Sequence, residues 1–291
     1  MSYLRPHSES QQLSDENFGL IAEWLHTQSG VRLARTQRAM LQSRLLRRVR
    51  DLQLPDLDSY MVLLHSPDGD KEQHHMVSAL TTHVSQFFRE MHHFQLLRLK
   101  ILPAILRQAQ HGQPIRIWSA GCANGQEPYS IAMILADLVP DYATYDVQIL
   151  ATDIDPVAIA FAHDGIYPAA AIPHIPSHYR SRFIVRHGDG QRIAPSLRNL
   201  VTFQRQNLHD SWPEPGTFDL IFCRNVAIYF DKSAQRRLWQ RFEFRLRPGG
   251  WLCLGHAERI PADIGSQLVP DGVTTYRLPP LTHETKGVLC P

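Results

Sequence analysis

This sequence lacks the features that mark membrane, secreted and disulfide-rich proteins. Its longest apolar stretch, residues 131–139, is interrupted by Asp137 and is far shorter than the roughly 20 residues that span a bilayer. No charged-then-apolar secretory signal opens the chain. The four cysteines stand far apart and form no CxxC pair, which excludes a disulfide scaffold and argues against a thiolate zinc site. The chain is therefore expected to be cytoplasmic and not inserted in a membrane.

The sequence also lacks an excess of charge of one sign. Lysine and arginine number 30 and aspartate and glutamate 28, so the formal net charge of the 291 residues is +2. Because a dedicated nucleic-acid-binding domain is normally strongly basic, no nucleic-acid partner is expected. Hydrophobic residues make up 43% and charged residues 20% of the chain, a composition that fits a globular protein and excludes a mostly disordered one.

The first part of the chain, up to about residue 111, has the periodicity of helices and almost no strand signal. Phe18, Ile21 and Leu25, for example, repeat at helical spacing. A longer helix is expected from about His92 to Ala109. Because Pro103 lies inside that range, the helix should be kinked or split there.

After Gly112, segments with strand character alternate with helical segments, which is typical of a parallel, doubly wound sheet. The stretch from about residue 165 to 204 breaks this alternation with several prolines and a hairpin-like pattern, so a small antiparallel insertion is expected there. The predicted fold class is α/β, with a helical N-terminal domain ahead of a Rossmann-like domain. In chain order we expect a flexible tail (1–12), a helical N-terminal domain (13–90), a connecting helix (91–112), an α/β domain (113–280) carrying the insertion, and a second flexible tail (281–291).

A glycine-containing turn follows the first expected strand. Residues 119–127 read Ser-Ala-Gly-Cys-Ala-Asn-Gly-Gln-Glu, and α/β sheets bind their ligands where strands end in such turns. Gly121 and Gly125 allow the backbone to approach a ligand closely, which a Cβ atom would prevent. The spacing is GxxxG, not the GxGxxG of dinucleotide-binding proteins, and no GK[ST] is present to hold a triphosphate.

The second expected strand ends in an acidic residue, Asp153. A carboxylate in this position can accept hydrogen bonds from both ribose hydroxyls. Together with the glycine turn it indicates an adenosine ligand without a pyrophosphate, of which S-adenosylmethionine is the common example. Simpler interpretations stay open: Gly121 and Gly125 could only form a tight turn, and Asp153 could only cap the next helix. Glu127 could bind the cofactor, or could be favoured at a helix start by the helix dipole.

Five short motifs are spread along the α/β part and the segment before it. They are Ser-Gln-Phe-Phe-Arg-Glu at 85–90, Gly-Cys-Ala-Asn-Gly-Gln-Glu-Pro-Tyr-Ser at 121–130, Ala-Thr-Asp-Ile-Asp at 151–155, Phe-Cys-Arg-Asn-Val-Ala-Ile-Tyr-Phe-Asp at 222–231 and Pro-Gly-Gly at 248–250. They resemble the chemotaxis receptor methyltransferases, the CheR family, and the likeness runs from about residue 14 to 278. The resemblance implies a helical domain, a methyltransferase domain with an inserted β-subdomain, and methyl transfer from S-adenosylmethionine to glutamate side chains of chemoreceptors. The product of the cofactor would be S-adenosylhomocysteine.

The resemblance also implies which residues meet the cofactor. The expected cofactor-binding residues are His83, Ser85, Arg89, Gly121, Glu127, Asp153, Asn207, Leu208, Asn225 and Val226. Glu127 corresponds to the residue that meets the amino group of the cofactor, and Asp153 to the one that holds the ribose. The pair 207–208 corresponds to residues flanking the adenine, and the pair 225–226 to residues beside the methionine portion.

Two of these positions depart from the family pattern. Ser85 stands where the family has threonine, and serine keeps the hydroxyl group. His83 stands where the family has asparagine. An imidazole still donates one hydrogen bond, but it differs from an amide in shape and pKa, so the cofactor affinity or its pH dependence should differ as well.

Arg89 and Tyr229 are the expected catalytic residues, and Tyr229 corresponds to a tyrosine near the departing methyl group. A glutamate is already ionised at pH 7, so no strong general base is required and both side chains would orient the reactants. Without the resemblance, a surface ion pair for Arg89 and simple packing for Tyr229 are the better explanations. No metal is expected, because the adjacent pairs His74-His75 and His92-His93 should point about 100° apart on a helix.

A basic helix face is the expected docking surface for the receptor. Arg44, Arg47 and Arg50 lie on a different side of their helix from its apolar residues. The resemblance supplies the partner, because the methylation helices of receptors are acidic; the alternative is an ordinary solvated face.

Some members of the family also bind a C-terminal receptor pentapeptide as an extra strand of the inserted subdomain. They tend to carry a longer, glycine-bearing loop there. In this chain Arg186 and Gln191 are joined by the short sequence His-Gly-Asp-Gly, so no pentapeptide tether is expected.

Two other functions compete with receptor methylation. A degenerate cofactor-binding domain could regulate or scaffold a signalling complex; His83 is the only hint of it, and the intact Arg89, Glu127 and Asp153 argue against it. A methyltransferase for nucleic acids or small molecules is the other possibility. The sequence Arg-Asn-Val at 224–226 lacks the prolines of the amino-methylating [DN]PP[YF] motif, and the charge balance gives no basic field the size of a nucleic-acid groove.

Overall fold

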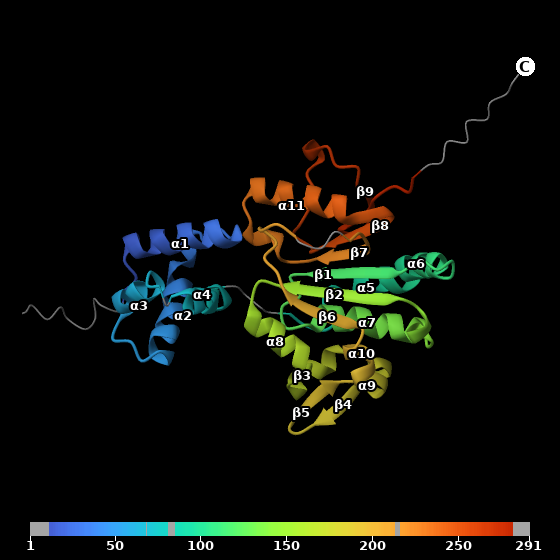
Figure 1. Cartoon of the computed structure of the whole chain (residues 1–291), viewed down its shortest axis with the longest axis horizontal. Helices are drawn as coiled ribbons and strands as arrows, with labels where there is room; N and C mark the ends of the chain where they lie inside the picture. The colour runs from blue at the N-terminus through green and yellow to red at the C-terminus, as the bar shows by residue number, and fades with distance from the viewer. Residues whose placement is uncertain (1–11, 68, 81–84, 213–215, 282–291) are drawn as a thin grey trace, which may run out of the picture.

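The computed structural model describes residues 12–67, 69–80, 85–212 and 216–281. Figure 1 shows a group of helices on one side of a larger part that is built around a twisted sheet.

The N-terminal part is helical, as expected. Its elements are α1 (Asp15–Ser29), the 3-10 turn η1 (Arg35–Gln37), α2 (Arg38–Asp51), α3 (Leu57–Leu64) and α4 (Asp70–Leu80). Ser14 caps α1 by accepting a hydrogen bond from the amide of Asn17 at 3.0 Å, and Gly30 ends the helix in the left-handed conformation, with φ 70°. The apolar stripes of the helices meet in a core that includes Leu25, Leu41 and Tyr60.

The helix expected over residues 92–109 is interrupted where the sequence predicted a break. It consists of α5 (Met91–Leu96), a π-helical stretch η2 (Leu97–Ile101) and α6 (Leu102–Ala109). Pro103 lies in the first turn of α6, directly after the π-helical stretch, so the change in helical pattern coincides with the residue that has no N–H to donate.

The main sheet is parallel over most of its width. In spatial order its strands are β6 (Val201–Arg205), β2 (Val147–Asp153), β1 (Ile115–Ala120), β7 (Phe218–Cys223), β8 (Leu246–Leu254), β10 (Thr275–Arg277) and β9 (Val269–Gly272). The strands from β6 to β8 pair in parallel, and β10 and β9 add an antiparallel edge. The chain moves to opposite sides of β1 to form β2 and β7, and such a switch point opens a crevice at the carboxyl ends of the strands.

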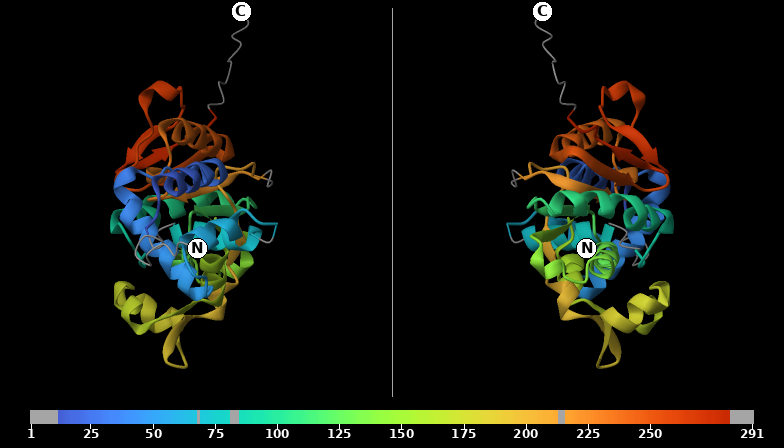
Figure 2. Two further views of the ribbon diagram at one scale, coloured as in Figure 1. Left: turned by 90° about the vertical axis from the view of Figure 1, so that its left-hand side faces the viewer. Right: turned by 90° about the vertical axis from the view of Figure 1, so that its right-hand side faces the viewer.

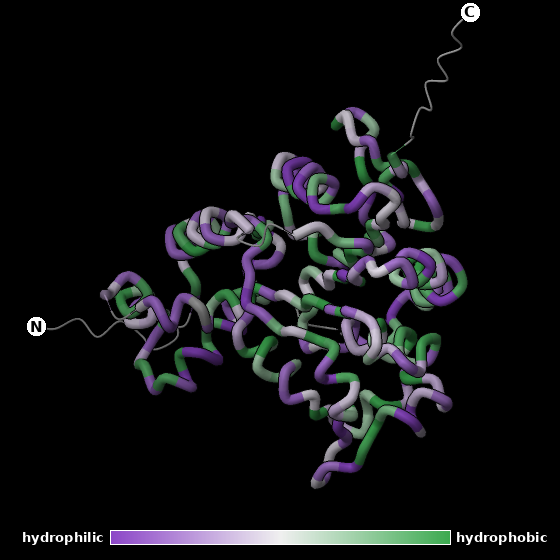
Figure 3. Tube along the Cα trace, turned by 45° about the vertical axis from the view of Figure 1, so that its right-hand side comes forward, coloured by the Kyte–Doolittle hydropathy of each residue, from purple (hydrophilic) through white to green (hydrophobic). Residues whose placement is uncertain are grey.

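Helices cover both faces of this sheet. On one face α5 and α6 are joined by α7 (Gln126–Leu138) and α8 (Pro156–Asp164), and the other face is covered by α11 (Lys232–Arg245). The short 3-10 turns are η3 (Tyr142–Thr144), η5 (Ala227–Tyr229) and η6 (Ala262–Ile264). Alternate residues of β1 serve the two faces: Ile117 packs in the core that contains α5 to α7, and Trp118 in the core that contains α11. Figure 3 shows hydrophobic stretches of the chain, in green, in the middle of the larger part. The strands β1, β2 and β7 are largely buried, as a doubly covered sheet requires.

A second, antiparallel sheet lies in the expected insertion. It is ordered β3 (Ile166–Tyr167), β5 (Gly190–Ile193) and β4 (Ile184–His187), accompanied by η4 (Ala169–His174), α9 (Ser177–Phe183) and α10 (Pro195–Arg198). Figure 2 shows that its hairpin projects from the lower end of the molecule. The strand β6 (Val201–Arg205) overlaps the end of the range 165–204 expected for the insertion, yet it pairs with β2 in the main sheet.

The fold class predicted from the sequence is therefore confirmed: a helical N-terminal part and a Rossmann-like part with an antiparallel insertion. Across the described ranges, no helix combines the length and the apolar character that crossing a bilayer needs.

Candidate active site

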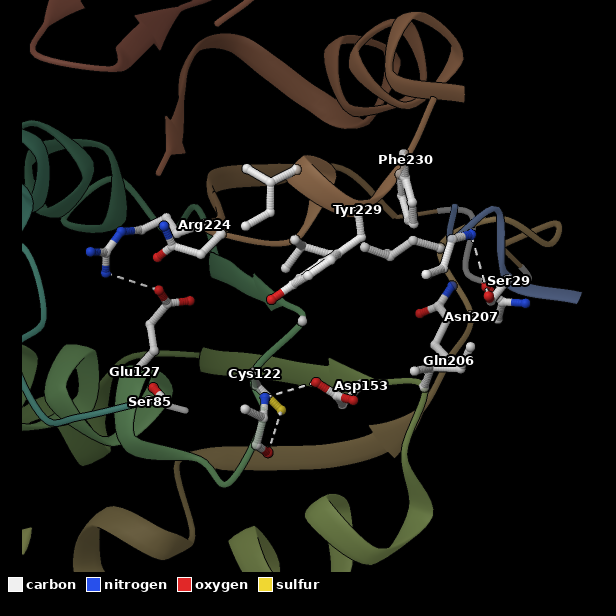
Figure 4. Close-up of a pocket in the computed structure, with 18 of the residues that line it drawn as sticks. Ser29, Ser85, Cys122, Glu127, Asp153, Gln206, Asn207, Arg224, Tyr229 and Phe230 are labelled. Atoms are coloured by element: carbon white, nitrogen blue, oxygen red, sulfur yellow. Dashed lines mark hydrogen bonds and ion pairs between the residues drawn. The ribbon is translucent and has the colours of Figure 1, made fainter. Parts of the chain in front are cut away.

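A cavity lies where several parallel strands end. Its walls come from the carboxyl ends of β1, β2, β6 and β7 and the residues that follow them, from the segment 85–89, and from the end of α1 and the residues after it. Figure 4 shows these side chains around a common space, with the phenol oxygen of Tyr229 pointing toward its middle. The position is the one at which doubly wound sheets bind ligands.

The glycine turn forms one wall of the cavity. Gly121 and Gly125 have φ of +80° and +86°, a region that side chains with a Cβ atom adopt only at a cost. A Cβ atom on Gly121 would lie 2.3 Å from Cγ2 of Val226. Two independent reasons therefore require glycine at position 121: the backbone conformation and the close contact with Val226.

Asp153 ties the end of β2 to this turn. Its Oδ2 accepts a hydrogen bond from the amide of Ala123 at 2.8 Å, and its Oδ1 accepts one from the amide of Asp155 at 3.0 Å. The residue that caps the next helix is Asp155, which accepts from the amide of Val157 at 2.8 Å. Asp153 is thus buried beside the cavity, and the helix cap that it could have formed is supplied by Asp155.

Glu127 is held from two sides at the start of α7. Ser119 donates to its Oε1 at 2.7 Å, and the guanidinium of Arg224 donates to its Oε2 at 3.0 Å. Burial raises the pKa of Glu127, and Arg224 and the Ser119 hydroxyl oppose that rise. Arg224 also makes an ion pair with Glu90 at 3.2 Å and donates to the backbone carbonyl of Arg89. One buried arginine therefore bridges two carboxylates and one carbonyl.

Arg89 lines the cavity between two residues with unusual backbone conformations. Phe88 and Glu90 have φ of 55° and 57°, and a left-handed conformation is strained for a bulky residue such as Phe88. Two interactions stabilise this strained conformation: the amide of Phe88 donates a hydrogen bond to the Ser130 hydroxyl at 3.0 Å, and Phe88 is buried, with 4% exposed. This conformation brings Arg89 to the cavity.

The N-terminal part completes the cavity wall. Ser29 and Val31 line the cavity, Val31 forms an isolated antiparallel bridge with Phe230, and the amide of Arg32 donates to the carbonyl of Tyr229 at 2.9 Å. These contacts join segments far apart in the sequence, and the sequence contained no signal for them.

Most of the residues predicted to bind the cofactor or to act in catalysis meet in this cavity. Those that line it are Ser85, Arg89, Gly121, Glu127, Asp153, Asn207, Leu208, Asn225, Val226 and Tyr229. His83 lies outside the described residues. The sequence reasoning gave no role to Arg224, although it stands in one of the quoted motifs, or to Ser119, whose hydroxyl faces Glu127 from β1.

The three arginines of the predicted docking surface differ in their surroundings. Arg47 and Arg50 are exposed. Arg44 is half-buried, and its guanidinium donates to the carbonyls of Ala79 and Leu80 at 3.0 and 2.8 Å, at the end of α4. Arg44 therefore stabilises the packing of α2 against α4.

His92 and His93, whose side chains were expected to point apart, instead lie together in a cluster with Glu90. One potential ligand atom from each of the three lies within 4.8 Å of the others, and the rings of His92 and His93 are 4.1 Å apart, although they are neighbours in the chain. Burial, followed by the charge of Arg224, lowers the pKa of His93 to about 3. Burial alone would raise the pKa of Glu90, but Arg224 and His256 lower it to about 2.

Comparison with known families identifies the chain. The model of the CheR methyltransferase SAM binding domain matches residues 83–270, and that of the CheR methyltransferase all-alpha domain matches residues 16–81. The chain belongs to the CheR methyltransferase family. The expected family, the S-adenosylmethionine cofactor and the methyltransferase activity are thereby confirmed, and the enzyme is favoured over a degenerate scaffold.

Curated relatives of this CheR-family methyltransferase cover almost its whole length. A probable chemotaxis protein methyltransferase of Rhizobium etli is 40% identical over 268 residues, which are 91% of this chain and 98% of the relative. Chemotaxis protein methyltransferase 2 of Pseudomonas aeruginosa is 40% identical over 84% of this chain and 87% of the relative. The chemotaxis protein methyltransferase of Salmonella typhimurium is 36% identical over 95% of both chains. These relatives agree with the expected role in chemotaxis.

Proposed function

We propose that this CheR-family enzyme methylates glutamate side chains of chemoreceptors, giving γ-carboxyl methyl esters and S-adenosylhomocysteine. The observation that carries the proposal is that Arg89 and Tyr229 face the same cavity as Glu127 and Asp153. A cation and a phenol beside the site of the methyl group suit an anionic acceptor, because they can orient a carboxylate that is already ionised.

Within this proposal each cavity residue has a role. Glu127 receives the amino group of the cofactor and Asp153 the ribose hydroxyls. Asn207 and Leu208 flank the adenine, while Asn225 and Val226 lie beside the methionine portion. Ser85, Arg89 and Gly121 complete the cofactor site, and Arg89 and Tyr229 align the acceptor carboxylate with the methyl group.

The reaction is tested with a receptor cytoplasmic fragment and S-adenosylmethionine labelled on its methyl group. Label should enter the fragment, leave it as methanol on mild alkaline treatment, and fail to enter a fragment whose methylation-helix glutamates are replaced by glutamine. Alkali distinguishes the outcome chemically, because methyl esters hydrolyse where methylated amines do not. Alkali-stable label would contradict a carboxylate acceptor.

We further propose that the reaction needs no metal. The Glu90, His92 and His93 cluster adjoins the guanidinium of Arg224, which lies 3.2 Å from Oε2 of Glu90, and a fixed cation at that distance repels a second cation. The proposed roles in cofactor binding and in alignment of the acceptor are all filled by side chains of the protein, without a metal ion. The same labelling assay, run with a chelator present, is expected to give an unchanged rate.

Docking of the receptor is proposed to use the exposed arginines of α2. Reversing Arg47 and Arg50 to glutamate should slow methylation of the receptor fragment by about tenfold at low salt, because exposed charges act mainly on the rate of association. The affinity for S-adenosylhomocysteine should not change. A double reversal of Arg107 and Arg237, which are exposed on α6 and α11, is the matched control. Equal slowing by both pairs would refute a specific docking surface.

A receptor pentapeptide is proposed not to be required. The hairpin of the insertion is short: His187 at the end of β4 pairs with Gly190 at the start of β5. Titration of a synthetic receptor tail should therefore give no more heat than a scrambled peptide, and a receptor fragment without its tail should be methylated at an undiminished rate. Saturable binding at low micromolar concentration would contradict this proposal and would indicate that the edge strand β4 recognises the receptor tail.

A further inference from the structure

The backbone that follows β7 turns sharply as it enters the cavity. Asn225 has φ of +60°, and its amide and those of Val226 and Ala227 all point to one side of the turn. Amides just before and at the start of a helical turn such as η5 have no backbone acceptor within that turn, and they need another acceptor when they are shielded from water. The acceptor here is a single side chain, the carboxylate of Glu258.

Glu258 collects four backbone amides. Its Oε2 accepts from Gly255 at 2.6 Å and from Asn225 at 2.9 Å, and its Oε1 accepts from Val226 at 3.0 Å and from Ala227 at 2.7 Å. The side chain comes from the segment after β8 and the residue is only 4% exposed. Both oxygens of the carboxylate are therefore used to hold the turn.

Gly255 makes room for this arrangement. A Cβ atom on Gly255 would lie 2.7 Å from the amide nitrogen of Asn225, 2.7 Å from its side-chain nitrogen and 2.7 Å from Oε2 of Glu258. Nothing larger than glycine fits while the turn stays where it is. The segments after β7 and β8 are thus in direct contact at the edge of the cavity.

The turn is also packed tightly on its cavity side. Cγ2 of Val226 occupies the space that a Cβ atom on Gly121 would need, so a shift of the turn moves Val226 against the glycine turn. Burial raises the pKa of Glu258, and the four amides oppose that rise by favouring the ionised form. The amides of the turn therefore offset part, but not all, of the cost of burying this carboxylate.

We propose that Glu258 is a positioning residue that presents Asn225 and Val226 to the cofactor. The inference rests on the proposed function in one respect, namely that these two residues lie beside the methionine portion of S-adenosylmethionine. Glu258 does not line the cavity. Its effect on the cofactor is transmitted through the backbone of the turn.

The test compares Glu258→Gln with a matched control. Glutamine keeps the shape but offers a donor in place of one oxygen, so two of the four amides lose their acceptor. The affinity for S-adenosylhomocysteine, measured by calorimetry, should fall about tenfold or more, with a matching rise in the KM for S-adenosylmethionine. The KM for the receptor fragment should not change. Glu258→Asp, which keeps the charge but retracts it, provides a milder variant if the glutamine variant does not fold.

The control is Asp219→Asn. Asp219 is also buried, at 4% exposure, and accepts from the amide of Arg116 and from Arg247, at the end of β7 away from the cavity. The substitution Asp219→Asn should lower thermal stability and leave the affinity for S-adenosylhomocysteine unchanged. Equal affinities in the Glu258 variants and Asp219→Asn would overturn the positioning role. Asn225→Gly distinguishes failure of the proposed cofactor site from failure of the positioning role. Wild-type affinity in Asn225→Gly would show that Asn225 does not contact the cofactor. Weak binding in Asn225→Gly together with normal binding in Glu258→Gln would refute only the role of Glu258.

Discussion

Replacing Arg224 with methionine should lower the free energy of unfolding by about 3–5 kcal/mol, because it leaves buried carboxylates without their cation. The side chain of Arg224 is 2% exposed, and those of its partners Glu127 and Glu90 are 12% and 13% exposed. Methionine fills a similar volume, so the loss reports mainly on charge and hydrogen bonding. The cofactor site should suffer with it, since Arg224 fixes one oxygen of Glu127.

Urea unfolding of the variant measures this loss, and Arg236→Met is the matched control. Arg236 pairs with Asp263 at the surface, where ion pairs contribute little, so that variant should unfold close to the wild type. Adding Glu127→Gln to Arg224→Met should recover part of the stability, because the stranded charge is removed, but not the binding of S-adenosylhomocysteine. Wild-type stability in Arg224→Met would show that the ion pairs of Arg224 with Glu90 and Glu127 contribute nothing to the free energy of unfolding.

The sequence located the cavity because its main determinants are local. A glycine turn after one strand and an acidic residue at the end of the next can be recognised without tertiary information, and parallel strand order brings their ends together. The bridge made by Arg224 could not be found in this way. Its partners Glu90 and Glu127 belong to other motifs, and only the tertiary fold brings the residue before α5 and the start of α7 to one guanidinium.

Edge strands and helix packing were harder to predict for physical reasons. Strand β6 is half exposed along its length, so its sequence carries no continuous apolar run to distinguish it from the neighbouring insertion. The arginines of α2 share one side of a helical wheel, but the wheel does not show where α4 packs. Arg44 donates a hydrogen bond to the carbonyl of Leu80 at the end of α4, whereas Arg47 and Arg50 remain exposed.

Replacing Asp153 with alanine should weaken the binding of S-adenosylhomocysteine by about 1–3 kcal/mol, which is about 5- to 150-fold in Kd. The carboxylate has two parts in the site. It accepts from the amides of Ala123 and Asp155, which shapes the glycine turn, and it is proposed to accept from the ribose hydroxyls. Alanine removes both, and the amides of Ala123 and Asp155 are left without that acceptor.

Asp155→Ala is the matched control for this prediction. Asp155 is buried two residues further on, caps α8 and accepts from Ser78 at 2.8 Å, but it does not line the cavity. Its replacement should lower thermal stability, as loss of a helix cap does, without changing the Kd. Equal weakening by the two variants would mean that Asp153 acts only through the fold.

The ribose contact itself is separated from the shaping of the turn by a second ligand. An analogue of S-adenosylhomocysteine without ribose hydroxyls should bind the wild type more weakly than the parent compound, because Asp153 then lacks its donors. In Asp153→Ala the two ligands should bind with nearly equal affinity, since the acceptor for those hydroxyls is already gone. Such non-additivity is expected only for groups in direct contact. If the analogue lost the same affinity in both proteins, Asp153 would be a support of the glycine turn and the ribose would be held by another residue.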